Sequence, residues 1–373
     1  MACHRQSILK PMELIDEYRN PELVKSLIKG INNRAQKISS NITIMEVCGS
    51  HTNAIGKFGI RDLLPDSINL VSGPGCPVCV TSAKDVNTAI FLSSIKETIF
   101  TTFGDMLRVP GSNRTSLQSA KADGADIRIV TSAADCISLA ENNSSKQIIF
   151  MGIGFETTSP TIASVIKTCS KKNIKNFSVF TVMKIMPPAI KMLIDDPALA
   201  IDGFLCPGHV SIITGTAAYN DIIKAGRSAV ITGFEPVDIL EGIYMILGQI
   251  ISKTKEVEIQ YKRAVSPEGN KKAREILFNV FETSSSVWRG IGEIPESGLV
   301  FKKEYQDFDT MKRFEVPDIA ADEISGCSCG EILRGIKHPG QCVLFKKICT
   351  PLNPIGPCMV SSEGTCSTYY KYH

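Results

Sequence analysis

The stretch INLVSGPGCPVCVTSAKDVNTAIFLSSI, residues 68–95, carries the pattern that decides the fold of this chain. It begins with an apolar run (68–73), continues through the turn GPGCPVC (73–79), and ends in a run with helical periodicity that starts near Ala83. The two glycines and two prolines of the turn exclude a regular helix or a central strand there. The stretch therefore predicts a buried strand, a sharp turn and a helix.

Similar apolar, β-branched runs recur along the chain, with helical patterns between them. Continuous apolar strands that alternate with helices are typical of parallel sheets covered on both faces. The runs form two sets of four, which predicts an α/β fold with two similar parallel-sheet domains and a cleft between them. The first set comprises 42–47, 68–73, 98–103 and 126–130, and the second comprises 147–153, 176–182, 202–206 and 229–234.

The domain boundaries follow from this grouping. The polar stretch ENNSSK (141–146) separates a first α/β domain, residues 41–145, from a second, residues 146–240. Residues 1–40 and 241–373 form a third part that is predicted to be mainly helical and irregular. Its last section, from Cys327, is rich in Gly, Pro and Cys, and it needs a crosslink or a metal in order to pack well.

Unusual turns follow the strands of both sets. They read CGSHTN (48–53), GPGCPVC (73–79), GFETTSP (154–160), CPGHV (206–210) and GFEPVD (233–238). In open α/β sheets, ligands bind beyond the carboxyl ends of the strands. We therefore expect these turns to converge on one cleft between the domains.

Composition and charge exclude some classes of function. The chain has 373 residues, a net charge of +3, 43% hydrophobic and 21% charged residues, and no basic stripe with aromatics, so a nucleic-acid role is not supported. The N-terminal residues lack the pattern of a signal peptide, and no apolar run is long enough to span a membrane, which predicts a cytoplasmic protein. Disulfides are rare in that compartment, so clustered cysteines are read as metal ligands or redox groups.

Six of the 13 cysteines lie in the last 47 residues. Four thiolates on irregular backbone can each bind one iron of a [4Fe-4S] cluster. Zinc also accepts four cysteines, although zinc ribbons usually carry two C-x-x-C pairs, which this tail lacks; unligated thiols are the third possibility. Cys327 and Cys358 are treated as spare. The expected cluster ligands are Cys329, Cys342, Cys349 and Cys366.

The turn GPGCPVC carries Cys76 and Cys79 at a strand end, and Thr81 or Ser82 is suited to cap the helix that follows. A thiol beside a helix N-terminus is stabilised as thiolate. A C-x-x-C pair at a strand-to-helix turn is also the arrangement of thioredoxin-like redox sites. A reversible dithiol is favoured here over a rigid turn whose cysteines only pack.

The turn CGSHTN carries Cys48 and His51. A thiolate with an imidazole nearby suits a transition metal such as iron, and the histidine could instead act as a base on the thiol. The alternative is a buried, inert cysteine. The second set of strands supplies Glu156, His209 and Glu235, which are candidate proton carriers or orienting groups, or simply structural residues. No phosphate-binding glycine motif is present in the sequence.

Taken together, these motifs resemble the HypD family of hydrogenase maturation factors. MEVCGSHTNAI, GPGCPVCVT, GIGFETTSPT, FLCPGHVSIITG, GFEPVDIL and CTPLNPIGPCMVSSEGTC occur in the order of that family, within residues 45 to 370. The resemblance implies two related α/β domains plus a cluster domain. It also implies a scaffold on which the Fe(CN)2CO group of nickel–iron hydrogenase is assembled, together with the small chaperone HypC. Cyanide would come from HypE, and the product would pass to the hydrogenase large subunit.

The resemblance also assigns roles to residues. It implies that Cys48 holds the transient iron that carries cyanide and carbon monoxide, and that Cys76 and Cys79 form the redox-active pair. It implies the same four [4Fe-4S] ligands as the spacing of the tail, Cys329, Cys342, Cys349 and Cys366, with Cys358 as a rival.

One position departs from the family pattern. Asn53 stands where the family more often has a second histidine, so His51 is expected to carry the role of that motif. Two other classes of function use the same cysteines. A [4Fe-4S]-dependent protein disulfide reductase would not need Cys48, and a zinc-stabilised interaction module would have no redox chemistry.

Overall fold

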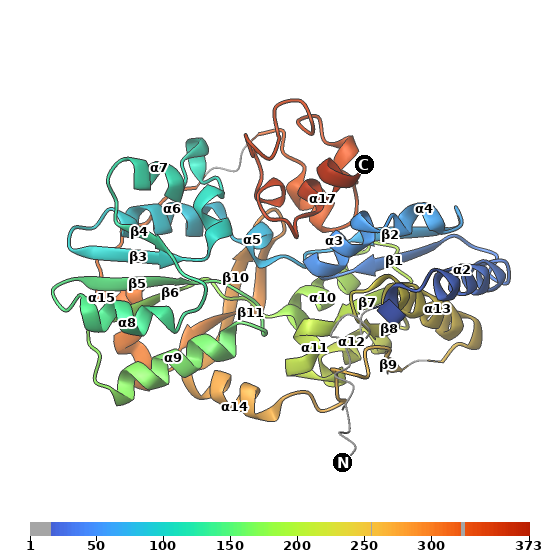
Figure 1. Ribbon diagram of the computed structural model, residues 1–373, viewed down its shortest axis with the longest axis horizontal. Coiled ribbons are helices and arrows are strands. Elements are labelled where there is room, and N and C mark those ends of the chain that lie inside the picture. Colours follow the sequence, from blue (N-terminus) through green and yellow to red (C-terminus); the bar gives the residue numbers. More distant parts are fainter. Residues whose placement is uncertain (1–15, 255, 322–324) are drawn as a thin grey trace, which may run out of the picture.

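The computed structural model describes residues 16–254, 256–321 and 325–373. Two α/β lobes lie side by side, and the C-terminal segment sits above and between them (Figure 1). The expected helical N-terminus is found where it is described, as helix α2 (Pro21–Ala35), whereas residues 1–15 lie outside the described residues. Within the described part, no helix is long and apolar enough to cross a bilayer.

Each lobe is built on a parallel sheet, which confirms the α/β fold class. The five-stranded sheet has the order β2-β1-β7-β8-β9, with β1 (Ile42–Glu46), β2 (Ile68–Ser72), β7 (Gly203–Pro207), β8 (Ser228–Thr232) and β9 (Val257–Ile259). The four-stranded sheet has the order β4-β3-β5-β6, with β3 (Thr98–Thr102), β4 (Ile127–Ile129), β5 (Gln147–Gly152) and β6 (Phe177–Thr181).

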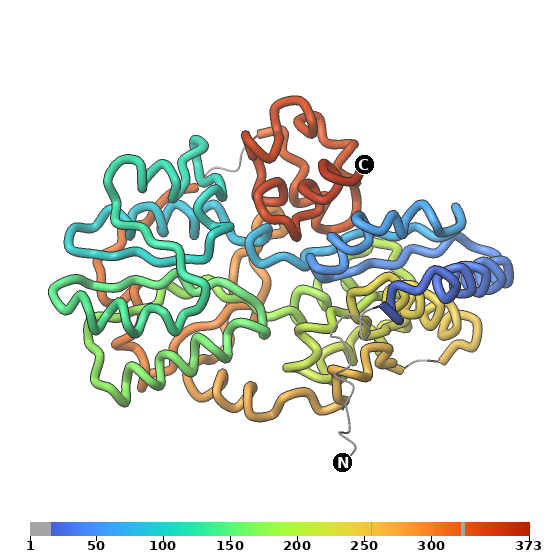
Figure 2. Tube along the Cα trace, in the orientation of Figure 1, coloured from blue at the N-terminus to red at the C-terminus, as the bar shows by residue number. Residues whose placement is uncertain are grey.

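Strands β1 to β8 are those that the sequence predicts, whereas β9 was not predicted. The eight predicted strands group differently from the prediction. The predicted division at residues 145/146 is wrong, because β3 pairs with both β4 and β5 and the division would cut through one sheet. Strand β1 pairs with β2 and with β7, so the chain leaves the first lobe after β2 and returns before α10 (Met186–Asp195) (Figure 2). All eight runs look alike in sequence, and pairing is decided by which buried faces meet.

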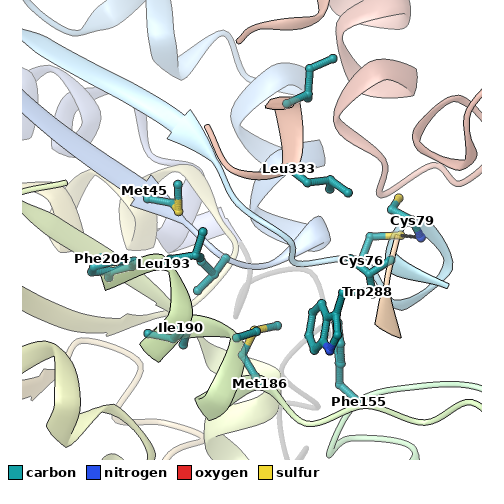
Figure 3. Packing of buried hydrophobic residues seen from close by; sticks show 14 of the residues in the cluster. Met45, Cys76, Cys79, Phe155, Met186, Ile190, Leu193, Phe204, Trp288 and Leu333 are labelled. Carbon is teal, nitrogen blue, oxygen red and sulfur yellow. Dashed lines mark hydrogen bonds between the residues drawn. The ribbon is translucent and has the colours of Figure 1, made fainter. Parts of the chain in front are cut away.

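Alternate residues of the five-stranded sheet enter different cores. Ile44, Leu205 and Val230 pack with helices α2 and α13 (Pro236–Ser252) on one face. Met45, Phe204 and Ile231 pack on the other face with α10 (Figure 3). This alternation is expected for a sheet buried on both sides. Because α2 belongs to this lobe, the prediction that both termini build the third part is corrected.

The four-stranded sheet is also buried on both faces. Helix α9 (Ser159–Lys171) shares a core with Ile148 and Phe150 on one face. Helices α6 (Ala83–Ser93) and α7 (Leu117–Ala122) share the opposite core with Phe100 and Ile149. Both lobes therefore have the same helix–sheet–helix layering, as predicted.

The region 241–318 is less helical than predicted. After α14 (Lys271–Val280) the chain forms an antiparallel hairpin, β10 (Phe281–Trp288) and β11 (Gly292–Phe301). The hairpin contacts both lobes, because Phe281 and Leu299 enter the core of the four-stranded lobe and Trp288 enters the core that α10 forms with the five-stranded sheet. Where a cleft was expected between the domains, side chains around the buried Trp288 are packed together (Figure 3).

The tail is irregular, as predicted, with two short helices, α16 (Cys329–Leu333) and α17 (Thr365–Tyr372). Helix α17 packs on α3 (Gly49–Lys57) of the first lobe. The remaining α-helices are α4 (Ile60–Leu63), α5 (Pro77–Val80), α8 (Asp135–Asn142), α11 (Gly208–Thr214), α12 (Asn220–Lys224) and α15 (Thr310–Arg313). Short 3-10 helices occur at 17–19, 104–108, 112–114, 216–219, 303–308, 339–341 and 357–359.

Candidate functional site

Four of the five predicted turns lie at one edge of the five-stranded sheet. The turns that begin at Cys48, Gly73, Cys206 and Gly233 follow or overlap the carboxyl ends of β1, β2, β7 and β8, which are neighbours in that sheet. The fifth turn, with Glu156, follows β5 in the other lobe. The predicted convergence of the turns is therefore found for the four turns of the lobe with the five-stranded sheet. Glu156 belongs to the other lobe.

Cys48 lies at the elbow between β1 and α3 and is 8% exposed. Its sulfur accepts hydrogen bonds from the backbone N–H groups of Ser50 and His51 at the start of the helix. Burial, together with the nearby negative charge of Glu363, nevertheless raises the pKa of Cys48 to about 12. The resting group is therefore a neutral thiol, and ionisation requires a partner such as a metal cation.

A buried carboxyl group holds this elbow. Glu46 is fully buried, and its Oε2 accepts the backbone N–H of Cys48 at 3.0 Å while its Oε1 accepts the hydroxyl of Thr52 at 2.5 Å. Burial raises the pKa of Glu46 to about 7, against the hydrogen bonds of Ser72 and Thr52, which lower it. The sequence analysis missed Glu46, although a carboxylate at the end of an apolar strand is an unusual residue there.

Glu363 was also missed, and it joins the tail to Cys48. The hydroxyl of Ser50 donates to Glu363 Oε1 at 2.6 Å. A Cβ on Gly49 would lie 2.5 Å from the Cβ of Glu363, so the close approach requires glycine at position 49. Asn53, the departure from the family pattern, donates from Nδ2 to the carbonyl of Ser362 at 2.9 Å. Position 53 therefore fastens the tail to α3.

The imidazole of His51 forms its hydrogen bonds with the end of β8 and the turn that follows it. Its Nε2 lies 2.8 Å from the carbonyl of Gly233 and 3.0 Å from the hydroxyl of Thr232. Burial lowers the pKa of His51 to about 4, so the ring is neutral near pH 7. Its backbone N–H, rather than its ring, contacts the sulfur of Cys48.

His209 shares an aromatic neighbour, Phe234, with His51. The His209 ring stacks on Phe234 with centroids 4.0 Å apart, and His51 approaches the same ring at 4.8 Å. Burial lowers the pKa of His209, whereas the charge of Glu363 raises it. Although part of the His209 side chain is exposed, its ring is partly desolvated against Phe234, and its charge is linked to Glu363 near Cys48.

The two predicted glutamates have structural contacts. Glu156 is 4% exposed and accepts the N–H of Met186 at 2.9 Å at the start of α10, and burial raises its pKa to about 7. Its Oε2 is buried without a hydrogen-bond partner among the described residues. Glu235 caps α13 and binds Arg19 through two hydrogen bonds of 2.5 and 2.9 Å. No described hydrogen bond of either carboxylate reaches Cys48.

The Cys76/Cys79 turn lies against the elbow of Cys48, because β1 and β2 are neighbours. The N–H of Gly49 donates to the carbonyl of Gly75 at 3.0 Å, and a Cβ on Gly75 would overlap the backbone of Cys48. Cys76 caps α5, and its sulfur accepts the N–H of Cys79 at 3.4 Å (Figure 3). Ser82 caps α6 in a capping box, as the sequence predicts.

A run of thiols leads from this turn into the tail. Cys79 is fully buried and hydrogen-bonds to Cys358, whose sulfur lies 2.9 Å from that of Cys329, and Cys329 in turn contacts Cys327. Burial raises the pKa of Cys79 well above its usual value. The thiolate expected beside a helix N-terminus is therefore not favoured at Cys79, because desolvation outweighs the short helix.

The tail cysteines surround one small cavity. Its walls also include Ile332, Leu344, Phe345 and Met359, and its sulfur groups are those of Cys327, Cys329, Cys342, Cys349, Cys358 and Cys366. A Cβ on Gly356 would lie 2.8 Å from the sulfur of Cys327, so glycine keeps this space open. Across the described ranges, no three cysteine, histidine or carboxylate side chains converge on a single metal-ion position. A donor set made only of thiols in an apolar cavity fits an iron–sulfur cluster.

The fold and the site define a two-lobed α/β protein with a run of thiols between a sheet-edge elbow and a cysteine-rich tail. Comparison with known proteins identifies the family. Residues 22–373 match the HypD family, described as the hydrogenase formation hypA family, so the chain belongs to the HypD family of hydrogenase maturation factors.

Relatives match along nearly the whole chain. Hydrogenase maturation factor HypD2 of Bradyrhizobium diazoefficiens is 43% identical over 369 residues, which cover 97% of both chains. HypD of Escherichia coli K12 is 43% identical over 368 residues, 97% of this chain and 98% of the relative. A putative hydrogenase expression/formation protein of Methanocaldococcus jannaschii is 44% identical over 351 residues, 94% of this chain and 97% of the relative.

Proposed function

We propose that this protein is a cytoplasmic scaffold on which the Fe(CN)2CO group of nickel–iron hydrogenase is assembled, in complex with HypC and with cyanide received from HypE. The observation that carries the proposal is the continuity of the thiols. The elbow of Cys48 touches the Cys76/Cys79 turn, and Cys79 touches Cys358, which contacts Cys329. Residues far apart in sequence thus connect an iron-holding position with a cysteine-lined cavity.

Cys48 would hold the iron as cargo. A metal cation displaces the proton of a thiol with a raised pKa, because thiolate is the ligand form. Glu46 and the N–H groups of α3 keep the sulfur at the elbow, and Glu363 and His209 lie close enough to influence a proton there. A cysteine of HypC would supply a further ligand.

The Cys76/Cys79 pair would supply two electrons. Oxidation of two thiols to one disulfide releases two electrons and two protons. Cleavage of the S–C bond of a thiocyanate carried by HypE, to a thiolate and cyanide, consumes two electrons. The buried position of the pair excludes water from this exchange.

The tail cavity would hold a [4Fe-4S] cluster, which when bound supplies single electrons. The ligands expected from the sequence are Cys329, Cys342, Cys349 and Cys366. The 2.9 Å contact between Cys329 and Cys358 supports a rival set in which Cys327 replaces Cys329, leaving Cys329 and Cys358 as a second dithiol. Iron and sulfide analysis of Cys327→Ser and Cys329→Ser separates the sets, because only loss of a true ligand reduces the cluster content.

The first test uses infrared spectroscopy of anaerobically purified protein co-expressed with HypC. Wild type should show cyanide and carbonyl stretches, and Cys48→Ala should lose them while retaining about four cluster irons. Cys169→Ala is the matched control, since Cys169 is also a buried thiol and lies on α9 in the other lobe. Stretches that persist in Cys48→Ala would contradict the proposal.

The run Cys79–Cys358–Cys329 also suits a second function, reduction of a disulfide on a protein substrate. Under that alternative Cys48 is dispensable, and no iron is bound outside the cluster. A protein that contains the cluster but shows no cyanide or carbonyl bands in either wild type or Cys48→Ala would favour it.

A further inference from the structure

We infer that the surface loop over the tail cysteines docks an acidic one-electron carrier protein that reduces the bound cluster. This inference rests on the proposed function, because it presupposes a cluster in the tail cavity. The docking surface, called the 343–352 patch below, consists of the exposed side chains of Val343, Lys346, Lys347, Ile348 and Leu352.

The patch exposes large apolar side chains, which are usually buried in a loop that binds no partner. Leu352 is 97% exposed, Val343 66% and Ile348 48%. They belong to one folded unit, because the N–H of Ile348 donates to Leu344 and the side chain of Asn353 donates to the carbonyl of Ile348 at 2.9 Å. Apolar groups held outward on an ordered loop indicate a contact surface.

The patch is also basic. Lys346 and Lys347 are exposed and form no ion pair with any other described residue, and Lys346 lies 5.8 Å above the ring of Phe345 and 5.9 Å above that of Tyr370. The sequence from Ile332 to Ser362 contains no aspartate or glutamate. A partner that covers this surface must therefore supply negative charge.

The position of the patch explains what the partner would do. Cys342 and Cys349 are buried directly under the loop that carries Lys346 and Lys347, with 9% and 6% exposure. Both cysteines line the tail cavity, as does Cys358, which interacts with Cys79 of α5. The patch therefore covers the wall of the cavity formed by Cys342 and Cys349, and Cys358 connects the same cavity with the Cys76/Cys79 pair.

Exposed apolar groups beside two exposed lysines fit the small, transient interfaces of electron-transfer partners, in which charge steers the encounter. At each encounter the carrier is oxidised by one electron and the cluster is reduced by one. Two encounters provide the two electrons that convert a Cys76/Cys79 disulfide, with two protons, into two thiols.

The test uses an acidic plant-type [2Fe-2S] ferredoxin as probe, with Lys346→Glu/Lys347→Glu and Leu352→Ser as variants of the patch. Lys171→Glu/Lys175→Glu is the matched control, because these two lysines are exposed on the far lobe. Stopped-flow reduction of the cluster by photoreduced ferredoxin should slow at least about tenfold in the charge reversal and less in Leu352→Ser. Reduction by dithionite should be unchanged in all variants.

Calorimetry with oxidised ferredoxin provides a readout independent of electron transfer. Binding to wild type and to the control should weaken as salt increases, and the charge reversal should bind weakly at every salt concentration. Equal rates and affinities for wild type and the charge reversal overturn the inference while leaving the scaffold intact. If the charge reversal weakens the binding of HypC in the same calorimetric assay and leaves the binding of ferredoxin unchanged, the patch is a HypC-binding surface. That result also overturns the inference. A protein without iron and sulfide overturns both this inference and the cluster of the proposed function.

Discussion

The elbow of Cys48 and the thiol run Cys79–Cys358–Cys329 are both buried, yet their surroundings differ. The sulfur of Cys48 meets backbone N–H groups and lies near the charge of Glu363. The sulfurs of the run mainly meet one another inside an apolar core. Burial raises the pKa in both regions, but only Cys48 has polar groups that can respond when its proton leaves. The elbow is suited to a metal ligand, and the run is suited to exchange between sulfurs.

The two regions are joined at Gly75. A side chain at position 75 would overlap the backbone of Cys48, so Gly75→Ala should push the elbow and the turn apart. We expect a loss of about 3 kcal/mol in the free energy of unfolding, together with loss of iron at Cys48. Chemical denaturation and infrared spectroscopy measure these two effects.

Gly104→Ala is the control, because a Cβ there would meet only a side-chain carbon 3.8 Å away. Its free energy of unfolding should change by less than about 1 kcal/mol. If Gly75→Ala proves as stable and as iron-loaded as this control, the two regions are not coupled through their backbones.

Replacing a buried carboxyl group at the edge of the apolar core that contains the thiol run tests the apolar side of the comparison. Glu156 follows Phe155, which stacks on Trp288 with centroids 5.8 Å apart, next to Cys76 (Figure 3). Its pKa rises from 4.5 to about 7 on folding, so the native state binds the extra proton. The stability that this proton contributes is complete below about pH 4.5 and is lost as the pH rises through about 7.

Glu156→Gln should therefore gain stability relative to wild type as the pH rises from 5 to 8, by up to about 3 kcal/mol. Unfolding measured at both pH values gives this difference. His51, whose lowered pKa acts in the opposite direction, is present in both proteins, so its contribution cancels. A parallel pH dependence of the two proteins would show that Glu156 is ionised in the folded state.

Removing a charge beside Cys48 tests the polar side. Glu363 raises the pKa of Cys48, so Glu363→Gln should lower that pKa and increase the thiolate fraction at any pH below it. We expect alkylation of Cys48 by iodoacetamide at pH 8 to accelerate several-fold, up to about tenfold. The amide can still accept the hydroxyl of Ser50, which keeps the elbow in place.

Mass spectrometry of the alkylated peptides provides the internal control for this prediction, because Cys79 should react at the same slow rate in both proteins. Faster alkylation of both cysteines would indicate general loosening of the tail. An unchanged rate at Cys48 would show that the charge of Glu363 does not reach the thiol.

The smallest effect is expected at Glu235, which sequence reasoning placed in the site. Its ion pair with Arg19 is partly exposed, and such pairs contribute about 1 kcal/mol or less. Glu235→Gln should lower the free energy of unfolding by no more than that and leave the iron content unchanged. Loss of the cyanide and carbonyl bands in this variant would show that Glu235 has a functional role in the site.

Much of the architecture was predictable from local pattern. Apolar runs predicted strands β1 to β8, five of which lead into the unusual turns, and Ser82 predicted the start of α6. Strand β9 was not predicted. The hairpin β10–β11 was missed, because its serines and glutamate hide the strand pattern. Glu46 and Glu363 were missed because the importance of each depends on what another segment brings beside it.

The sequence by itself determined which segments are strands, where their turns lie and which residue types those turns carry, since periodicity and backbone restriction by Gly and Pro act locally. Only the tertiary structure decided that β1 pairs with β7, that the ring of His51 turns toward Gly233, and that Cys79 meets Cys358. Pairing and side-chain direction depend on which buried surfaces fit together across the whole chain. For that reason the cysteines could be identified from the sequence, whereas which cysteine contacts which could not be predicted.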